Sequence, residues 1–375
     1  MRILFTGGGS GGHFYPIIAV VEELEKITAE RKLVPPMLFF ASDSAYKPKL
    51  LAKHAIRFEK ITTGKMRRYF SPLNVLDFFK TAWGVLRAFF VIFRLYPDII
   101  FGKGGYASFP AVLAGKLLHI PVFIHESDSV PGRVNKWAGN FADRIAVSYP
   151  EASRFFQKQA SRVAWTGNPV RSTIRKTPPE AVHKLLKLDA GSPVMLVLGG
   201  SQGAEMINNL ILESLVKILP TVQIIHQTGD KNFETVKQRA SIILGDSPLK
   251  ERYKIFDYLE DDTLAMAAGG ADIVVSRAGS AIFEIASWGL PSIIIPISDS
   301  NGNHQRLNAF NYAKTGAAVV IEEENISPTI FSNELYRLVG NKELMKTMGE
   351  RALAFYKPDA GRKIAEEILK IGLNH

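Results

Sequence analysis

Short apolar runs alternate with longer stretches of helical periodicity along the whole chain. The runs of the first half are Ile3 to Phe5, Met37 to Phe40, Ile99 to Phe101, Val122 to Ile124 and Ile145 to Val147. Those of the second half are Met195 to Leu198, Gln223 to His226, Ile273 to Val275, Ile293 to Ile295 and Ala318 to Ile321. This rhythm is typical of parallel strands covered by helices on both faces. It predicts an α/β chain with two doubly wound parallel-sheet domains.

Both halves begin with a strand that runs into a glycine-rich loop. The loops are Gly7 to Gly12 and Gly199 to Gly203. The turn-rich stretch Thr166 to Pro178 predicts the linker between the domains. Open α/β sheets bind ligands beyond the carboxyl ends of their strands. We therefore expect the ligand site in a cleft between the two domains.

The stretch from Val75 to Tyr96 is the one segment to consider as a membrane span. Four charged side chains interrupt it, Asp77, Lys80, Arg87 and Arg94, and each would cost about 2.5 to 3.5 kcal/mol at the centre of a bilayer. On a helix they form one polar stripe beside a wide apolar arc, so we expect no span. Two interpretations stay open: a helix fully buried in the N-terminal domain, or a helix that contacts an anionic membrane surface. The membrane contact would use Lys65, Arg67, Arg68, Leu76, Phe79 and Trp83.

The formal net charge of +10 indicates an anionic partner, such as nucleic acid, an acidic membrane or a phosphorylated substrate. We expect no nucleic-acid partner, because the chain has neither a basic arm nor cations interleaved with aromatic residues. The absence of cysteine excludes disulfides and thiolate metal sites. The first residues lack the features of a signal peptide, so we expect the protein to stay in the cytosol.

The loop Gly7 to Gly12 favours a phosphate-containing ligand, because its N–H groups and the following helix start can face an anion. We expect that helix to begin near Tyr15. His13 follows the loop directly, and a helix start disfavours positive charge on the imidazole, which can then accept a proton. A His that only caps or packs remains an equal alternative. NAD is not favoured, because no acidic residue precedes Asp43 where the ribose contact would lie.

A second glycine loop, Gly102 to Ser108, also follows a strand and predicts a further anion site in the same cleft. His125 and Glu126 end the next strand, where ligand contacts gather, although packing roles remain open for both. In the second half, Gly199 to Ala204 suits a nucleotide diphosphate. Arg277, Glu284, His304, Gln305 and Asn308 are weaker candidates for contacts to the ribose and the sugar.

Several motifs occur together in one order: TGGGSGGHFYP, FGKGGYASFP, HESDSVPGRVNK, TGNPVR, LVLGGSQGAEMINN, SRAGSAIFEIA and HQRLNA. This set resembles the MurG family of glycosyltransferases over nearly the whole chain. The resemblance implies a GT-B fold and an inverting mechanism that uses no metal and no cofactor. It implies UDP-GlcNAc as the donor and undecaprenyl-pyrophosphoryl-MurNAc-pentapeptide (lipid I) as the acceptor, with lipid II as the product. It also implies a peripheral protein on the cytoplasmic face of the plasma (inner) membrane.

The resemblance also implies domains and site residues. Residues 1–167 would form the acceptor and membrane domain, 168–348 the UDP-GlcNAc domain, and a helix of about 349–375 would pack back on the first. His13 and Glu126 would be catalytic, with His13 as the base. The donor contacts would be Arg171, Ser201, Gln202, Leu259 at the uracil, Arg277, Glu284 at the ribose, and His304 and Gln305 at the sugar. The acceptor contacts would be Ser10, Gly11, Gly12, His13, Gly104, Gly105, Tyr106, Asn135 and Asn208.

Three alternatives remain. Another GT-B transferase would use a different lipid acceptor. A UDP-GlcNAc 2-epimerase would share the fold and the nucleotide and would need no acceptor. A module that binds a nucleotide sugar or a membrane without catalysis is the third, because function does not follow from fold.

Overall fold

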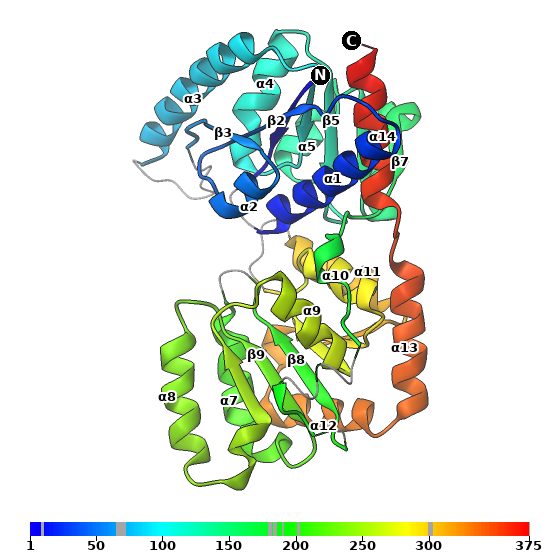
Figure 1. Cartoon of the computed structure of the whole chain (residues 1–375). Helices are drawn as coiled ribbons and strands as arrows, with labels where there is room; N and C mark the ends of the chain where they lie inside the picture. The colour runs from blue at the N-terminus through cyan, green and yellow to red at the C-terminus, as the bar shows by residue number, and fades with distance from the viewer. Residues whose placement is uncertain are drawn as a thin grey trace. The chain divides into compact units, whose positions relative to one another are not determined.

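The computed structural model describes residues 1–8, 11–64, 73–178, 182, 186–189, 191–200, 203–298 and 303–374, with only the backbone described for 73–78. The chain forms two compact units, which Figure 1 shows coloured along the sequence. Unit 1 consists of Met1–Arg171 and Lys357–His375, and unit 2 of Ser172–Tyr356. The boundaries expected from the sequence lay at 167 and about 349. The functional names given to the two domains stay predictions.

Unit 1 contains a seven-stranded sheet in which every described pair of neighbours is parallel. Its strand order is β3-β2-β1-β4-β5-β6-β7, so the direction of winding reverses between β1 and β4. The strands are β1 (Arg2–Thr6), β2 (Met37–Ser42), β3 (Arg57–Lys60), β4 (Ile99–Gly102), β5 (Val122–Glu126), β6 (Arg144–Val147) and β7 (Val163–Trp165).

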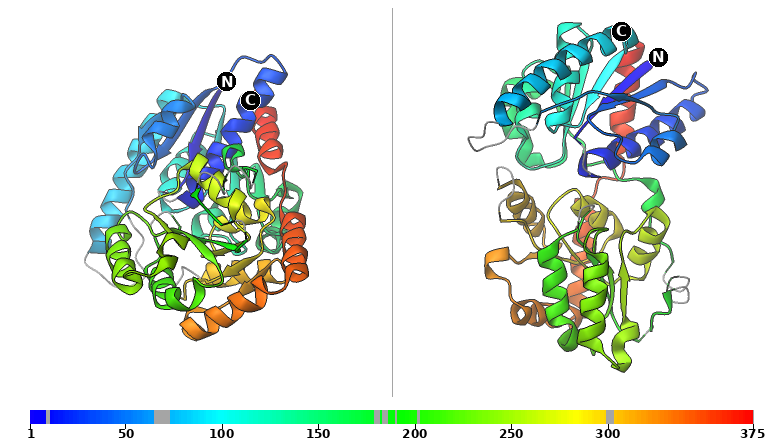
Figure 2. Two further views of the ribbon diagram at one scale, coloured as in Figure 1. Left: turned by 60° about the horizontal axis from the view of Figure 1, so that its bottom comes forward. Right: turned by 90° about the vertical axis from the view of Figure 1, so that its left-hand side faces the viewer.

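Helices cover both faces of this sheet. The α-helices are α1 (Gly11–Glu30), α2 (Pro48–Lys53), α3 (Leu73–Leu95), α4 (Phe109–Leu117), α5 (Arg133–Ala138) and α14 (Ala360–Leu373). Two 3₁₀ segments, η1 (Tyr106–Ser108) and η2 (Pro150–Arg162), complete the unit. In Figures 1 and 2, α1 lies beside α14, the last helix of the chain, and the two helices are in contact.

The alternation of side chains along β1 explains the two apolar layers. Ile3 and Phe5 belong to one buried cluster with residues of α1 and α14. Leu4 belongs to a second cluster with residues of α3 and α4. Successive side chains of a strand point to opposite faces, so one strand supplies both cores. This is why the first strand reads as a continuous apolar run.

Unit 2 repeats the architecture with a six-stranded parallel sheet in the order β10-β9-β8-β11-β12-β13. Its strands are β8 (Val194–Leu198), β9 (Gln223–Gln227), β10 (Tyr253–Phe256), β11 (Ile273–Ser276), β12 (Ser292–Ile294) and β13 (Ala318–Val320). Its α-helices are α7 (Glu205–Ile218), α8 (Phe233–Leu244), α9 (Asp261–Gly270), α10 (Ala281–Trp288), α11 (His304–Ala313), α12 (Pro328–Val339) and α13 (Lys342–Phe355). Short 3₁₀ segments are η3 (Ser172–Ile174), η4 (Pro248–Arg252) and η6 (Glu323–Asn325).

The predicted fold class is confirmed: both units are doubly wound parallel sheets. Each of the ten predicted apolar runs coincides with a strand to within two residues at either end. Three strands were missed, namely β3, β7 and β10. All three lie at a sheet edge and are only partly buried. Edge strands of this kind lack the continuous apolar run that marks a buried strand.

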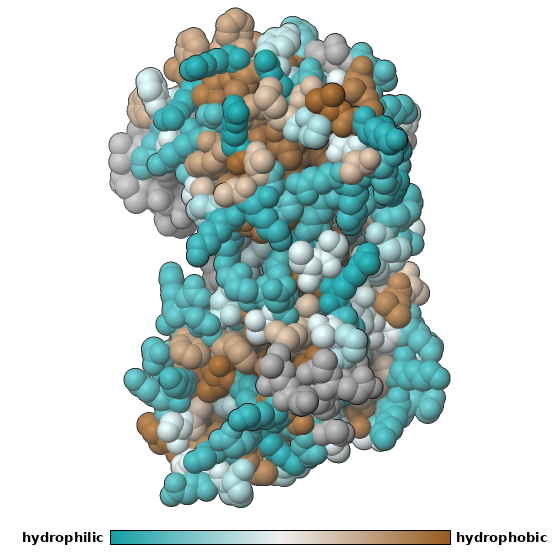
Figure 3. Space-filling view, viewed as in Figure 1, coloured by the Kyte–Doolittle hydropathy of each residue, from teal (hydrophilic) through white to brown (hydrophobic). Residues whose placement is uncertain are grey.

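Helix α3 has one buried face and one exposed face. Ala88 and Ile92 are fully buried against the sheet of unit 1. The other face exposes Phe79, Trp83, Leu86, Phe90 and Phe93, each by more than half of its surface. The interpretation of α3 as a fully buried helix is therefore wrong. In the view of Figure 3, brown hydrophobic residues reach the surface of unit 1 between teal hydrophilic ones.

Candidate active site

The two glycine loops of unit 1 meet where the strand order reverses. Gly8 follows β1 and donates its N–H to the carbonyl of Gly104, which follows β4, at 3.1 Å. Gly104 and Gly105 have φ angles of +83° and +78°, which glycine adopts at little cost. A Cβ on Gly105 would lie only 3.0 Å from Cα of Gly8. The two loops can touch because both Gly8 and Gly105 lack a side chain.

The imidazole of His13 lies over this contact. Its Nδ1 is 3.2 Å from the place that a Cβ on Gly8 would occupy, and its Cε1 is 3.5 Å from the corresponding place on Gly105. Helix α1 begins at Gly11 rather than near Tyr15, so His13 lies in its first turn. The N–H groups of a first helical turn have no acceptor within the helix and face outward. Gly11 and Gly12 belong to this turn, whereas Ser10 lies outside the described residues.

Tyr106 links the second glycine loop to the end of β2. Its hydroxyl donates to Oδ2 of Asp43 at 2.8 Å. Burial, together with this bond to a carboxylate, raises the pKa of Tyr106 to about 12. The phenol is therefore a donor at neutral pH, and it holds the loop to the strand next to β1.

Glu126 ends β5 and is almost fully buried, with a carboxylate that accepts three hydrogen bonds. The donors are the backbone N–H of Asp128 at 2.9 Å, the N–H of Gly132 at 3.0 Å and Nδ2 of Asn135 at 2.9 Å. Burial raises the pKa of Glu126. The same Asn135 amide also donates to the carbonyl of His125 at 3.0 Å. The pair therefore shapes the loop between β5 and α5, and any direct contact of Glu126 or Asn135 with substrate stays a prediction.

Lys103 lies between Gly102 and Gly104 in the second glycine loop, and its side chain is buried. Its ammonium donates to Nδ1 of His125, to Oγ of Ser127 and, at 3.0 Å, to Oδ1 of Asn168. These three acceptors use all three ammonium hydrogens. Burial lowers the pKa of Lys103. This cation joins the loops after β4, β5 and β7, a role that the sequence did not reveal.

Arg171 is the last residue of the first segment of unit 1, and it is 4% exposed. Its Cζ lies 3.7 Å from the centroid of the Tyr15 ring in α1. The sequence placed Arg171 with the donor domain. Its packing places it in unit 1, and its contact with the donor stays a prediction.

In unit 2, the glycine loop again follows the strand at which the winding reverses. Gly200 and Gly203 have φ angles of +76°, and Gly203 has no room for a side chain, because a Cβ would lie 2.5 Å from the carbonyl of Thr228. Ser201 and Gln202 of this loop lie outside the described residues. Leu259 follows β10 and is 1% exposed. Its backbone N–H donates to Oε1 of Gln227 at 3.0 Å.

Two other predicted donor contacts follow β11. Arg277 pairs with Glu323 at 2.6 Å and donates to the carbonyl of Ile295 at 3.1 Å. Burial lowers the pKa of Arg277, whose charge is already matched by Glu323. Glu284 lies in the first turn of α10 and is partly exposed.

Helix α11 begins with the predicted sugar contacts. His304 is its first residue, and the side-chain oxygen of Gln305 accepts the N–H of Ile297 at 3.3 Å. Asn308 is 1% exposed and donates to the carbonyl of Ala278 at 3.2 Å, so it ties α11 to the segment after β11.

Asn208 was predicted as an acceptor contact, and it lies in α7 of unit 2. Its Nδ2 donates to the carbonyl of Thr228 at 3.0 Å, and its Oδ1 is 3.0 Å from Nε2 of His226. His226 is fully buried and its other ring nitrogen lies 2.7 Å from the hydroxyl of Tyr253. Burial lowers the pKa of His226 to about 3. The imidazole is thus neutral, with Nε2–H donating to Asn208 and Nδ1 accepting from Tyr253.

Two features are absent from the described part of the chain. Within it, no three His, Asp or Glu side chains lie close enough together to hold a metal ion. Among its helices, none is both long and apolar enough to cross a membrane.

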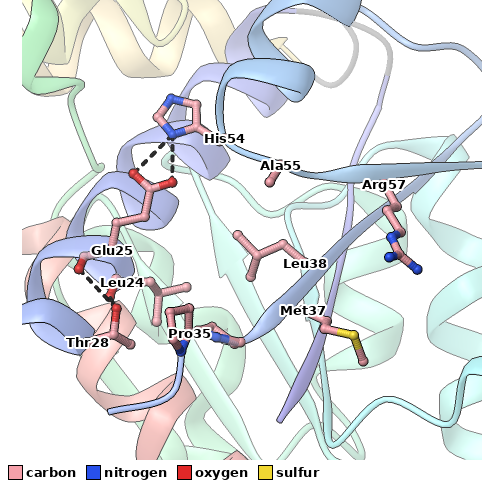
Figure 4. A pocket seen from close by; sticks show the side chains of 10 residues that line it. Leu24, Glu25, Thr28, Pro35, Met37, Leu38, His54, Ala55 and Arg57 are labelled. Atoms are coloured by element: carbon pink, nitrogen blue, oxygen red, sulfur yellow. Dashed lines mark hydrogen bonds and ion pairs between the residues drawn. The ribbon is translucent and has the colours of Figure 1, made fainter. Parts of the chain in front are cut away.

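A cavity of about 310 Å³ in unit 1 lies away from these residues. Figure 4 shows the imidazole of His54 directed at the Glu25 carboxylate, with Leu24 and Leu38 along the wall. Nδ1 of His54 is 3.0 Å from Oε1 of Glu25. The cavity lies beside the first residues of β2 and β3, whereas ligands of open α/β sheets bind at the opposite, carboxyl ends. None of the predicted site residues that the structure describes lines it.

Comparisons with known proteins identify the family. Residues 3–147 match the N-terminal domain of glycosyltransferase family 28, and residues 194–365 match its C-terminal domain. A Bacillus cereus relative named UDP-N-acetylglucosamine--N-acetylmuramyl-(pentapeptide) pyrophosphoryl-undecaprenol N-acetylglucosamine transferase 2 is 35% identical over 351 residues, which are 92% of this chain and 94% of the relative. A Treponema denticola transferase of the same name, without the final number, is 34% identical over 380 residues, with 95% and 94% coverage.

Solved structures share the fold. The crystal structure of Acinetobacter baumannii MurG matches with a TM-score of 0.72 at 24% identity, covering 98% of this chain and 99% of that one. The UDP-GlcNAc 2-epimerase of Neisseria meningitidis bound to UDP-GlcNAc matches with a TM-score of 0.68 at 16% identity, covering 99% and 100%. Structural likeness at these identities shows the fold alone. The sequence matches go further: this chain is a GT-B glycosyltransferase that belongs to glycosyltransferase family 28, in its MurG branch.

Proposed function

We propose that the protein transfers GlcNAc from UDP-GlcNAc to the 4-hydroxyl of MurNAc in undecaprenyl-pyrophosphoryl-MurNAc-pentapeptide. The product is lipid II, the precursor of peptidoglycan. The observation that carries the proposal is the identity of about a third with transferases of this name over more than 90% of the chain. The contact between the two glycine loops beneath His13 supports this proposal, because glycine loops at strand ends suit a pyrophosphate such as that of the acceptor.

The proposed chemistry needs a base, an electrophile and a stabilised leaving group. His13 accepts the proton of the MurNAc 4-hydroxyl while that oxygen attacks C1 of GlcNAc. The bond between C1 and the UDP oxygen breaks, and UDP leaves on the opposite face, so the configuration at C1 inverts. The N–H groups of the Gly199–Gly203 loop, the start of α7 and Arg171 stabilise the charge on the departing diphosphate. Protein groups thereby do what a metal ion does in other transferases.

The other site residues would divide between binding and support. Glu284 would accept the ribose hydroxyls, Leu259 would meet the uracil, and His304 with Gln305 would hold the GlcNAc hydroxyls. Glu126 would act through the loop that it holds, because its carboxylate already accepts three N–H groups.

The test is transfer of labelled GlcNAc by the purified protein. Three reactions are run in parallel, with a lipid I analogue, with a diacylglycerol acceptor and with UDP-GlcNAc alone. We expect label in lipid only with the lipid I analogue. Transfer to diacylglycerol would indicate a transferase with another acceptor, and conversion of UDP-GlcNAc without acceptor would indicate an epimerase.

We also propose that the protein binds the cytoplasmic face of an anionic membrane through the exposed face of α3. Phe79, Trp83, Leu86, Phe90 and Phe93 recur at alternating intervals of four and three residues and form one stripe along the helix. Lys80, Arg87 and Arg94 each follow a member of the stripe and are exposed. Aromatic side chains beside cations suit the interface of an acidic membrane. Lys65, Arg67, Arg68 and the side chain of Leu76, also predicted to take part, lie outside the described residues.

Sedimentation with phosphatidylglycerol vesicles tests the membrane contact. The Phe79→Glu, Trp83→Glu double variant should remain in the supernatant while the parent protein sediments. The matched control is Val216→Glu, Ile242→Glu, which adds the same charge at exposed apolar positions of unit 2 and should sediment as the parent does. A folded Phe79→Glu, Trp83→Glu protein that still sediments would end this proposal.

A further inference from the structure

Gln227 is the last residue of β9, the strand that lies between β8 and β10 in the sheet of unit 2. It is 5% exposed. The glycine loop follows β8 on one side, and Leu259 follows β10 on the other. The side chain of Gln227 therefore stands between the two segments for which opposite ends of the donor nucleotide are expected.

The carboxamide of Gln227 bonds to both neighbours. Its Nε2 donates to the carbonyl of Gly200 at 3.2 Å, and its Oε1 accepts the N–H of Leu259 at 3.0 Å. Neighbouring strands are about 4.8 Å apart, so the two segments are separated by about two strand spacings, close to 10 Å. One planar amide thus spans the carboxyl edge of three strands and uses a donor and an acceptor to do so.

Backbone contacts give this bridge a rigid base. Thr228 and Gly229 donate their N–H groups to the carbonyls of Phe256 and Asp257, each at 2.9 Å. The segment after β9 is thereby paired with the segment before Leu259. On the other side, Gly203 packs directly on the carbonyl of Thr228. A change at Gln227 should therefore alter the spacing of the two outer segments more than the sheet itself.

We propose that Gln227 is a positioning residue that sets the separation between the glycine loop at Gly200 and the backbone at Leu259, so that the two fit a uridine diphosphate together. This rests on the proposed function, which puts the diphosphate at the glycine loop and the uracil at Leu259. Gln227 itself need not touch the donor. Its loss weakens the binding of UDP and of the donor, and it leaves the acceptor side and the chemical step unchanged.

The chain contains a matched control at the other end of the same strand. Gln223 begins β9 and is 2% exposed, and its amide makes three hydrogen bonds, to the N–H and carbonyl of Asp189 and to the carbonyl of Ser192. Gln223→Met removes a buried amide network of similar size that lies far from the carboxyl ends of the strands. Any effect of Gln227→Met that Gln223→Met lacks is therefore local to the carboxyl edge.

The experiment measures UDP binding by calorimetry, thermal unfolding, and the KM for donor and acceptor in the full-length protein. Gln227→Met should raise the Kd for UDP and the donor KM about tenfold, equivalent to about 1.4 kcal/mol, with kcat and acceptor KM unchanged. Gln227→Glu keeps the acceptor for Leu259 and loses the donor to Gly200, and it should weaken UDP binding at least as much. Gln223→Met should lower the unfolding temperature without changing the Kd for UDP.

Two kinds of failure are distinguishable. If the parent protein binds UDP and Gln227→Met binds it equally well, or if Gln223→Met weakens binding as much, Gln227 has no positioning role. If the parent does not bind UDP, the proposed function itself fails. Because calorimetry needs no acceptor, the result does not depend on the identity of the lipid.

Discussion

The guanidinium of Arg171 lies over the ring of Tyr15, with 3.7 Å between Cζ and the ring centroid. Tyr15 belongs to the first helix of unit 1, and Arg171 is the last residue before the chain enters unit 2. The contact is largely desolvated, since Arg171 is 4% exposed. The contact therefore fixes the end of the first segment of unit 1 to α1, the helix that also carries His13.

Replacing Arg171 by Met should lower the free energy of unfolding by about 1 to 2 kcal/mol, because a desolvated cation over an aromatic ring is worth about that much. Urea unfolding measures the change. A double-mutant cycle with Tyr15→Leu separates the pairwise term from the loss of packing. If the two substitutions are additive, the stacked pair contributes no coupling energy and the contact is incidental.

His13→Ala should lower kcat by about 10² to 10⁴, the usual contribution of a general base. UDP binding should be unchanged, because His13 lies in unit 1 beside the glycine loops proposed for the acceptor. The measurement is GlcNAc transfer at saturating donor, with calorimetry of UDP binding as the control for folding. Full turnover in the variant would remove His13 from the mechanism.

Gly105→Ala should impair both stability and transfer. The residue has a φ of +78°, and a Cβ would lie 3.0 Å from Cα of Gly8, so the two loops must separate. We expect a loss of about 1 to 3 kcal/mol in unfolding free energy and a raised acceptor KM. Gly132→Ala is the control, since its φ is −63° and a Cβ there meets nothing within 4 Å. Equal effects of the two substitutions would contradict the argument.

Stability should fall as the pH drops below about 6.5, and His226 should account for part of the loss. Its folded-state pKa is lowered to about 3 by burial, so between these values the unfolded chain binds a proton that the folded chain does not. The contribution of His226 to the free energy of unfolding is therefore full above pH 6.5. Below pH 6.5 it decreases by up to about 1.4 kcal/mol per pH unit. Urea unfolding of parent and His226→Gln proteins at pH 7, 6 and 5 should show the gap between them narrowing. A constant difference would mean that His226 takes up a proton in the folded protein over this pH range just as it does in the unfolded chain.

The parts of the site that depend on strand order could be predicted from the sequence. Glycine loops after β1, β4 and β8 lie at the carboxyl edges of their sheets, because a strand, a loop and a helix in that order can hardly place them elsewhere. The start of α1 was predicted too late, near Tyr15 instead of Gly11. Glycine disfavours helix in isolation, and here tertiary packing overrides that preference.

The supporting residues could not be predicted, because their partners are distant in sequence. Lys103 bonds to side chains 22, 24 and 65 residues away, and Gln227 to backbone groups 27 and 32 residues away. Each looked like an ordinary loop or strand residue until the fold brought its partners together. For the same reason, the family resemblance implied ligand contact for Asn135 and Asn208, but the sequence could not show that their amides hold neighbouring loops.

Helix α14 gives unit 1 a particular order of assembly. Ile364 and Ile368 of this helix belong to the same buried cluster as Ile17 and Val21 of α1. A ribosome releases α1 long before α14, with the whole of unit 2 in between. Synthesis of unit 1 therefore begins first and ends last. Until α14 is made, one apolar face of the unit 1 sheet is partly uncovered. Any chain released before α14 would carry that exposed face, which makes it a substrate for chaperones and proteases rather than a smaller working enzyme.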